Sequence, residues 1–204
     1  MAATTARDAA GPILIGIDDD SWTGHLDRVE RWLRHVVVVQ AEFRTLAADT
    51  ATKIREPHWH EYLTRIAEAA VEHEHQAAEM FRVIGRDPAR TGTLAGTVMA
   101  KAREGLADLV GLATGASAPW RDVQQLFLVS LGAIGAFGVA EQLGYAIGIP
   151  ALAEIAFGVT VEKFKHHRLL QEAVLEFAAL AILYDSELGD PAAAGQGVAG
   201  RPAT

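Results

Sequence analysis

The sequence contains no cysteine among its 204 residues, which excludes disulfides, thiolate metal sites and cysteine nucleophiles. It also has no excess of basic charge, because 18 Lys and Arg face 26 Asp and Glu, for a formal net charge of -8 at pH 7. This balance, without any basic run, argues against a nucleic-acid-binding protein. Gly-rich phosphate loops, nucleophile elbows and His-Glu-x-x-His zinc motifs are missing as well. The first residues lack the basic start and long apolar run of a secretion signal, so we expect a cytoplasmic location.

The sequence also lacks the short alternating β-branched segments that strands require, and helical periodicity dominates instead. Five helices are predicted, at about Trp22–Ala48, Pro57–Ile84, Thr93–Ala113, Pro119–Ile147 and Pro150–Tyr184. Long helices joined by short turns pack antiparallel, so the predicted fold is all-α. We expect an up-down four-helix bundle, with the 93–113 helix as a fifth, crossover helix.

The ends of the chain differ in composition from this helical region. Residues 1–20 are expected to be a flexible N-terminal segment, and 186–204, rich in small residues with Gly and Pro, a disordered C-terminal tail. The bundle is therefore predicted over residues 21–185.

The segment Leu126–Ile149 is apolar and carries one charge, Glu141, so by length it could span a bilayer. Its small residues also form a seam that would let another helix approach closely, at Gly132, Ala136, Ala140 and Gly144. A buried central helix of a soluble bundle explains the same pattern, and we prefer that interpretation to a membrane span. The seam predicts a homodimer formed through this helix.

Ionisable side chains fall on or near the apolar faces of the predicted helices. Glu162 and His166 stand four residues apart near the middle of an apolar stripe, and Glu42, Glu141 and His73 lie on or beside the apolar faces of three other helices. Burying such groups is costly unless they pair with one another or bind a metal. Lys163, Lys165 and His167, by contrast, are expected on a solvated flank.

This set of residues resembles the ferritin-like superfamily of carboxylate-bridged bundles. The superfamily's pattern is one Glu from each of two helices and Glu-x-x-His from each of two others. Glu42 and Glu141 match the single glutamates, and Glu162 with His166 matches the paired motif loosely, at a spacing of four. The resemblance implies a di-iron or manganese centre, with oxygen-dependent redox chemistry, as in a metal-dependent oxidoreductase, or iron handling.

The second paired motif is ambiguous. Glu72 and His75 have the literal spacing of three, but they project to a polar face, whereas His73, beside Glu74, is aimed at the apolar one. Two alternatives to a metal centre also stand. Glu162 and His166 could be an ordinary helical side-chain pair. The second alternative is a non-catalytic bundle dimer with a vestigial metal site.

Overall fold

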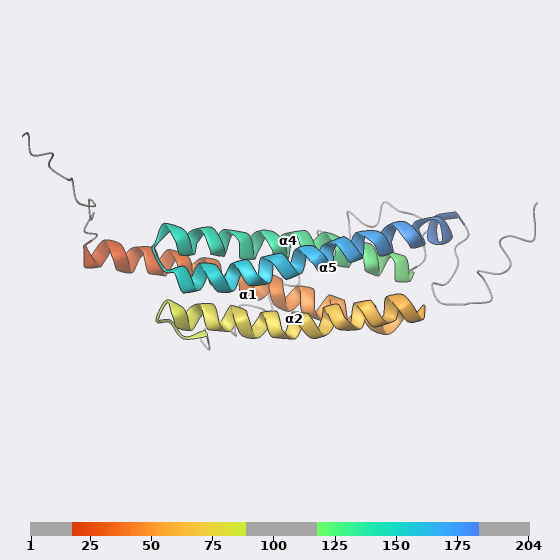
Figure 1. Ribbon diagram of the computed structural model, residues 1–204, viewed down its shortest axis with the longest axis horizontal. Helices are drawn as coiled ribbons and strands as arrows, with labels where there is room; N and C mark the ends of the chain where they lie inside the picture. The colour runs from red at the N-terminus through yellow and green to blue at the C-terminus, as the bar shows by residue number, and fades with distance from the viewer. Residues whose placement is uncertain (1–17, 89–117, 184–204) are drawn as a thin grey trace, which may run out of the picture.

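The computed structural model describes residues 18–88 and 118–183. These residues form helices without any strand: α1 (Asp19–Lys53), α2 (Pro57–Val83), α4 (Ala118–Ala146) and α5 (Pro150–Leu183) (Figure 1). The all-α prediction is therefore confirmed. The predicted 93–113 helix, and the terminal segments expected to be flexible or disordered, lie outside the described residues.

Local capping explains where the first two helices begin. The Asp18 carboxylate accepts a hydrogen bond from the Ser21 backbone N–H at 2.8 Å, and this bond lowers the pKa of Asp18. The Glu56 carboxylate caps α2 in the same way by accepting from the Trp59 N–H at 2.7 Å, next to Pro57 at the first helical turn. Such side chains satisfy backbone donors that have no partner within the helix.

Glycines follow the ends of α2 and α4. Gly85 and Gly148 both adopt a φ of 70°, the left-handed conformation that costs glycine least. The first helix, however, continues to Lys53 and not to about Ala48, because Thr50 and Ala51 are buried in the bundle and packing extends the helix.

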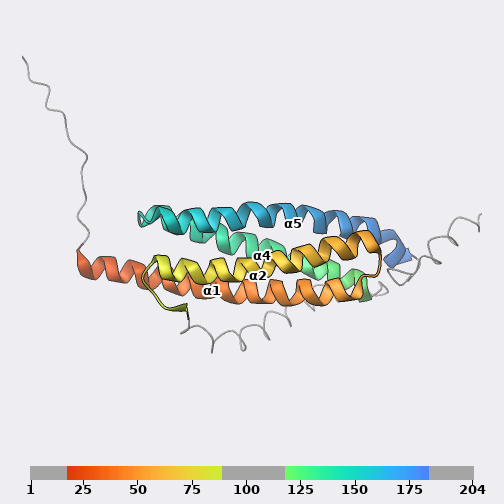
Figure 2. The same cartoon turned by 60° about the horizontal axis from the view of Figure 1, so that its bottom comes forward.

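The four helices form two antiparallel hairpins, α1–α2 and α4–α5, lying side by side (Figures 1 and 2). Trp32 Nε1 near the start of α1 donates to the Ala136 carbonyl late in α4 at 2.9 Å. Lys53 at the end of α1 pairs with Asp122 early in α4 at 2.7 Å, so these helices are also antiparallel. The directions are therefore up, down, down, up, and α2 ends at the end of the bundle opposite to that where α4 begins. Among the described helices, α2 and α4 therefore run parallel, and the strict up-down alternation expected from the sequence is not observed between them.

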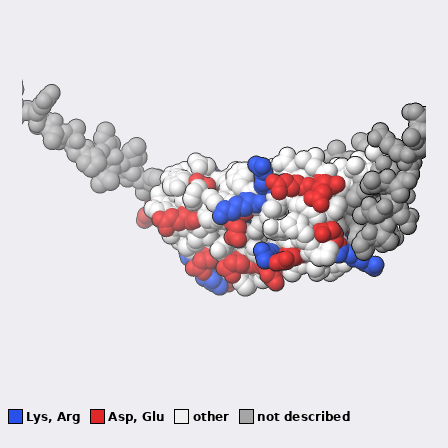
Figure 3. Space-filling view, turned by 45° about the vertical axis from the view of Figure 1, so that its right-hand side comes forward, with Lys and Arg blue, Asp and Glu red and all other residues white. Residues whose placement is uncertain are grey.

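The core consists of two hydrophobic clusters, one in each half of the bundle. The first contains the large side chains Phe43, Trp59, Leu126 and Phe177, and the second contains Leu33, Phe81, Phe137 and Leu152. The face shown in Figure 3 is mixed in charge, with groups of Asp and Glu interspersed with Lys and Arg and without a broad basic patch.

Candidate functional site

A buried polar layer separates the two hydrophobic clusters. On α1, Gln40 lies between Val36 of one cluster and Phe43 of the other. On α2, His73 lies between residues 70 and 77, and on α5, Lys163 lies between residues 159 and 170. All three polar side chains are at most 1% exposed. Such a layer is costly in a core unless its groups interact with one another or with a ligand.

The central contact of this layer joins α2 to α5. His73 Nε2 lies 3.0 Å from Glu162 Oε2, and because an ionised carboxylate only accepts, the imidazole N–H donates. His73 is fully buried, whereas the Glu162 side chain is 49% exposed. Glu162 therefore connects the buried layer with solvent, and it does not lie in the middle of the buried face as its position in the sequence suggests.

His166 lies near His73 and Glu162 at the interface between α2 and α5. Its ring centroid lies 6.0 Å from that of His73, one turn of α5 beyond Glu162. Burial lowers the pKa of His166 to about 4. Burial and the charge of Lys163 lower the pKa of His73, and Glu162 opposes that shift without reversing it. The hydrogen bond from His73 lowers the pKa of Glu162, so at pH 7 two neutral imidazoles stand beside an ionised carboxylate.

Lys163 lies in the core, contrary to the prediction from the sequence. It is 1% exposed and not on a solvated flank. Its Nζ lies 4.1 Å from the ring centroid of Phe43 on α1 and 5.5 Å from that of Phe137 on α4, within the range of cation–π contacts. Burial lowers the pKa of Lys163 to about 7, although the charge of Glu162 acts in the opposite direction.

His167 also differs from its predicted solvated position, because it packs on α4. Its ring stacks on that of Phe127 at 4.5 Å, and Ser130 Oγ lies 2.7 Å from its Nδ1. Ser130 donates its own proton to the Phe127 carbonyl at 2.6 Å, so the imidazole N–H donates to Ser130. These contacts join α5 to α4, whereas Glu162 joins α5 to α2.

The ambiguity on helix α2 is resolved by burial. Glu72 and His75 pair with each other across 3.6 Å on the surface, and their side chains are 63% and 73% exposed. Glu74 instead forms an ion pair with Arg44 at 2.8 Å. The literal Glu-x-x-His motif is therefore on the solvent side, and His73 is the α2 residue that reaches the layer.

The predicted carboxylates Glu141 and Glu42 are displaced from His73 and Glu162. Gly144 closely approaches the Ala153 backbone, which sets the register of α4 and α5. Glu162 is nine residues beyond Ala153 and Glu141 three residues before Gly144, a difference of about six residues or about 9 Å along the axis. Glu141 is half-buried there.

Glu42 is buried, at 8% exposed, but on the flank of α1. Glu42 lies on the same side of α1 as Val38 and Leu46, which are four residues before and after it. Its neighbour Phe43 is the residue that points into the core. Within the described helices, no three His, Cys, Asp or Glu side chains converge as they stand on a point that could hold a metal ion. The dinuclear centre that the sequence suggests therefore does not fit the residues present.

A single metal held by His73, Glu162 and His166 would require these side chains to move, because they do not converge on one point as they stand. His73 Nε2 and Glu162 Oε2 lie 3.0 Å apart, which is also about the separation of two ligands held about 2.1 Å from one metal at a right angle. The proton that Nε2 donates to Glu162 would have to move to Nδ1 before Nε2 could bind a metal. Two imidazoles on one tetrahedral metal have ring centroids about 5 Å apart, so His166 would need to move by about 1 Å. Nδ1 of His73 and Nδ1 of His166 are both buried without a protein partner, so each ring retains a nitrogen for a further contact.

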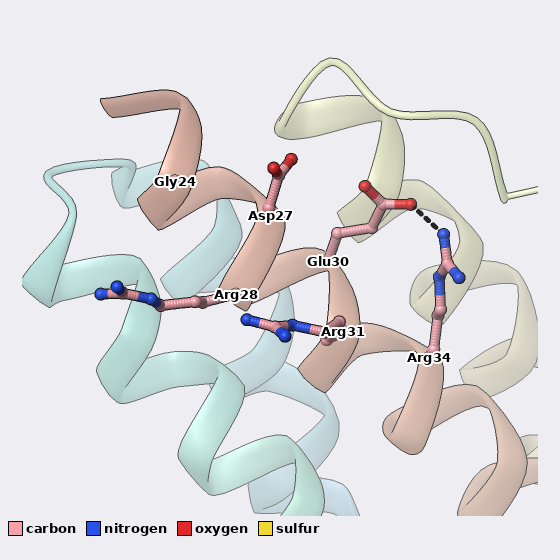
Figure 4. Close-up of a pocket in the computed structure, with 6 residues that line it drawn as sticks. All are labelled: Gly24, Asp27, Arg28, Glu30, Arg31 and Arg34. Carbon is pink, nitrogen blue, oxygen red and sulfur yellow. Dashed lines mark hydrogen bonds and ion pairs between the residues drawn. The ribbon is translucent and has the colours of Figure 1, made fainter. Parts of the chain in front are cut away.

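A surface pocket lies elsewhere, along the first turns of α1 (Figure 4). It has a volume of about 460 Å³ and is lined by Gly24, Asp27, Arg28, Glu30, Arg31 and Arg34. Arg34 is paired with Glu30 there. None of the residues predicted to bind metal lines this pocket.

Comparison with models of protein families, with curated proteins and with solved structures found no match. Of the described helices, Pro119–Ala146 in α4 is long and apolar enough to cross a membrane, and half of its most apolar window is buried inside the bundle. A buried core helix meets the same criterion.

Proposed function

We propose that the protein is a metal-binding helical bundle of the ferritin-like kind, with one divalent metal held by His73, Glu162 and His166. The observation that carries this proposal is the buried His73 imidazole at ligand spacing from an ionised carboxylate, with a second neutral imidazole beside it. Neutral imidazole and ionised carboxylate are the protonation states that ligate metals. The order up, down, down, up of the described helices supports the ferritin-like part, because such folds also contain two successive core helices that run parallel and need one long crossover between them.

Two histidines and one carboxylate are the ligand set of mononuclear non-haem iron sites, and iron or manganese is the proposed cofactor. Bound iron would supply oxygen-dependent redox chemistry, whether as an oxidoreductase or in iron handling. The chain's own residues would hold the ion between α2 and α5. The half-exposed Glu162 carboxylate would give the ion a route from solvent to the buried histidines.

The test is metal binding by protein purified without chelator and reconstituted with Fe²⁺ or Mn²⁺. We expect one equivalent for the wild type, and loss of binding in Glu162→Gln, which keeps the side chain's shape but removes its charge. Glu72→Gln is the matched control, because Glu72 is exposed on α2 and should leave binding unchanged. Less than about a tenth of an equivalent in the reconstituted wild type would refute the proposal.

The second candidate function is a non-catalytic bundle that dimerises through α4, with a vestigial site. The small-residue seam predicted for this contact is mostly buried in the bundle, because Ala136 and Ala140 are in the core and Gly144 packs on Ala153 of α5. The outer face of α4 instead exposes Leu131 (49%) and Val139 (42%), and a Cβ built on Gly135 between them meets nothing within 4 Å. Between Asp122 and Glu141 this helix carries no charge. A second copy could therefore pack there without like-charge repulsion despite the net charge of -8.

Light scattering tests the dimer. We expect a dimer for the wild type and a monomer for Leu131→Glu, which places a charge on the outer face. A monomeric wild type at micromolar concentration would exclude this candidate without affecting the metal proposal.

A further inference from the structure

We propose that a second copy of the chain docks on the outer face formed by α4 and α5, with Phe164 of each copy packed against Gly135 of the other. The two-fold axis of this dimer runs along the bundle, so that α5 of one copy lies over α4 of the other. This inference rests on the dimer given as the second candidate function, and it specifies the contacts and the direction of that dimer.

Large apolar side chains are exposed where α4 and α5 meet. His167 of α5 stacks on Phe127 of α4. Phe164 stands one turn before His167 and is 55% exposed, and Leu131 stands one turn after Phe127 and is 49% exposed. Phe157, two turns before Phe164 on the same side of α5, is 52% exposed. A continuous exposed apolar face of this kind marks an interaction site.

The same face has a hollow on α4. Gly135 lies between Leu131 and Val139, each four residues away, and a Cβ built on Gly135 meets nothing within 4 Å. Glycine inside a helix is destabilising relative to alanine, because it loses more backbone freedom on folding. No contact within the described helices requires a small residue at this position. The close approach of a side chain from another molecule would require one.

The exposed ring and the hollow lie at the same level of the bundle. Ser130 Oγ of α4 lies 2.7 Å from His167 Nδ1 of the antiparallel α5, which fixes the register of the two helices. Phe164, three residues before His167, is therefore level with residue 133, about 3 Å along the axis from Gly135. Side chains of a helix tilt toward its N-terminus, and for Phe164 this direction leads toward the level of Gly135.

These positions decide the direction of the dimer. With a two-fold axis across the bundle, α4 would face α4 and α5 would face α5. The exposed rings of Phe157 and Phe164 would then meet one another and hold the two hollows apart, which leaves empty space in the interface. With the axis along the bundle, each Phe164 faces a Gly135 at the same level, and the pair is closed and isologous.

The size and charge of the face suit a second copy. Helix α4 has 29 residues, or a length of about 43 Å, and lies beside α5 (Figure 1). Two helices about 10 Å apart present a width of about 20 Å, so the face covers about 850 Å², close to the roughly 800 Å² per partner of a stable interface. Helix α4 has no charge between Asp122 and Glu141, and Arg168 on α5 is paired with Glu172. Like charges therefore do not oppose this contact.

The experiment measures the dissociation constant of the dimer by sedimentation equilibrium of the full chain. Phe164→Ala removes the ring and Gly135→Phe fills the hollow, so each should weaken the dimer by about tenfold or more. The double variant moves the ring from α5 to α4, and it should dimerise at least about tenfold more tightly than the two single effects combined predict. Gly158→Phe is the control and should change nothing, because Gly158 is open to solvent and lies nine residues before His167, on the side of α5 opposite to α4.

The outcomes separate this inference from the dimer itself. A wild-type dimer in which the two substitutions act independently, or in which neither weakens the dimer more than Gly158→Phe does, overturns the inference and leaves the dimer through α4 standing. A monomeric wild type removes both, and the metal proposal is unaffected. If that monomer sediments with phosphatidylcholine vesicles, the face binds a lipid surface instead. If the thiol of a monomeric Phe164→Cys resists iodoacetamide, the chain itself covers the face. Circular dichroism identifies a misfolded Gly135→Phe, in which case Gly135→Leu takes its place.

Discussion

Replacing Lys163 with Met should stabilise the metal-free protein, and the gain should depend strongly on pH. The lysine is buried between Phe43 and Phe137, where its charged form is poorly solvated. Its pKa is lowered from 10.5 in water to about 7 in the folded protein. Between these values the unfolded chain binds a proton that the folded chain does not, so stability rises with pH across this window.

The magnitude follows from the same two values. At 1.36 kcal/mol for each pKa unit, a fall from 10.5 to about 7 corresponds to about 5 kcal/mol. This is an upper value, because the core can relax around a buried ammonium and admit water. We therefore expect Lys163→Met to gain about 2–5 kcal/mol at pH 6, and much less at pH 10.

Urea unfolding of chelated protein, followed by circular dichroism between pH 6 and pH 10, measures the effect. The charge of Lys163 also acts on His73 and His166, but these imidazoles are neutral above pH 7. Above that pH the difference between the two stability curves therefore reports on Lys163. A difference that stays constant with pH, or a variant less stable than the wild type at pH 6, would refute the buried position of the lysine.

Two further predictions concern neighbouring features of the bundle. A Cβ at Gly144 would lie 2.7 Å from the Ala153 backbone nitrogen, so Gly144→Ala should lower the unfolding free energy by about 1–3 kcal/mol. Gly138→Ala is the control, because a Cβ at Gly138 meets nothing within 4 Å, and this substitution should stabilise α4 by up to about 1 kcal/mol. Equal effects of the two substitutions in thermal melts would contradict the close packing of Gly144 on Ala153. The His166 ring, with its pKa lowered to about 4, should stay neutral at pH 5.5 in NMR titrations of the metal-free protein. Because the unfolded chain takes up that proton first, His166 should also make the unfolding free energy fall as the pH decreases from 6.5 to 4. An NMR titration midpoint of His166 near 6.5 would instead show that its ring is solvated.

The helices were largely predictable from the sequence because their ends are set by local chemistry. Pro57 begins α2, and Gly85 and Gly148 end α2 and α4, as their types suggest. The inward direction of His73 was predictable too, since α2 has a polar face that contains Glu72 and His75. The parallel direction of α2 and α4 was not, because helical periodicity carries no information about which ends meet.

The position of Lys163 could not be predicted for a different reason. Helix α5 is apolar on much of its circumference, with Phe157 and Phe164 more than half exposed and Lys163 buried. Hydrophobicity therefore does not mark its inner face, and the stripe read from the sequence was centred on Glu162 instead. The side chain's aliphatic stem packs in the core as an apolar residue would, and only the contacts with α1 and α4 reveal where the amino group ends.

The most direct test of the proposed metal site is to follow the histidine side chains by ¹⁵N NMR while Zn²⁺ is added. The account predicts that the imidazole signals of His73 and His166 change together and that the change is complete at one equivalent. The exposed His75 signal should be unaffected at that point. Changes confined to His75 or other surface histidines, or no change in His73 and His166, would contradict a metal held between α2 and α5.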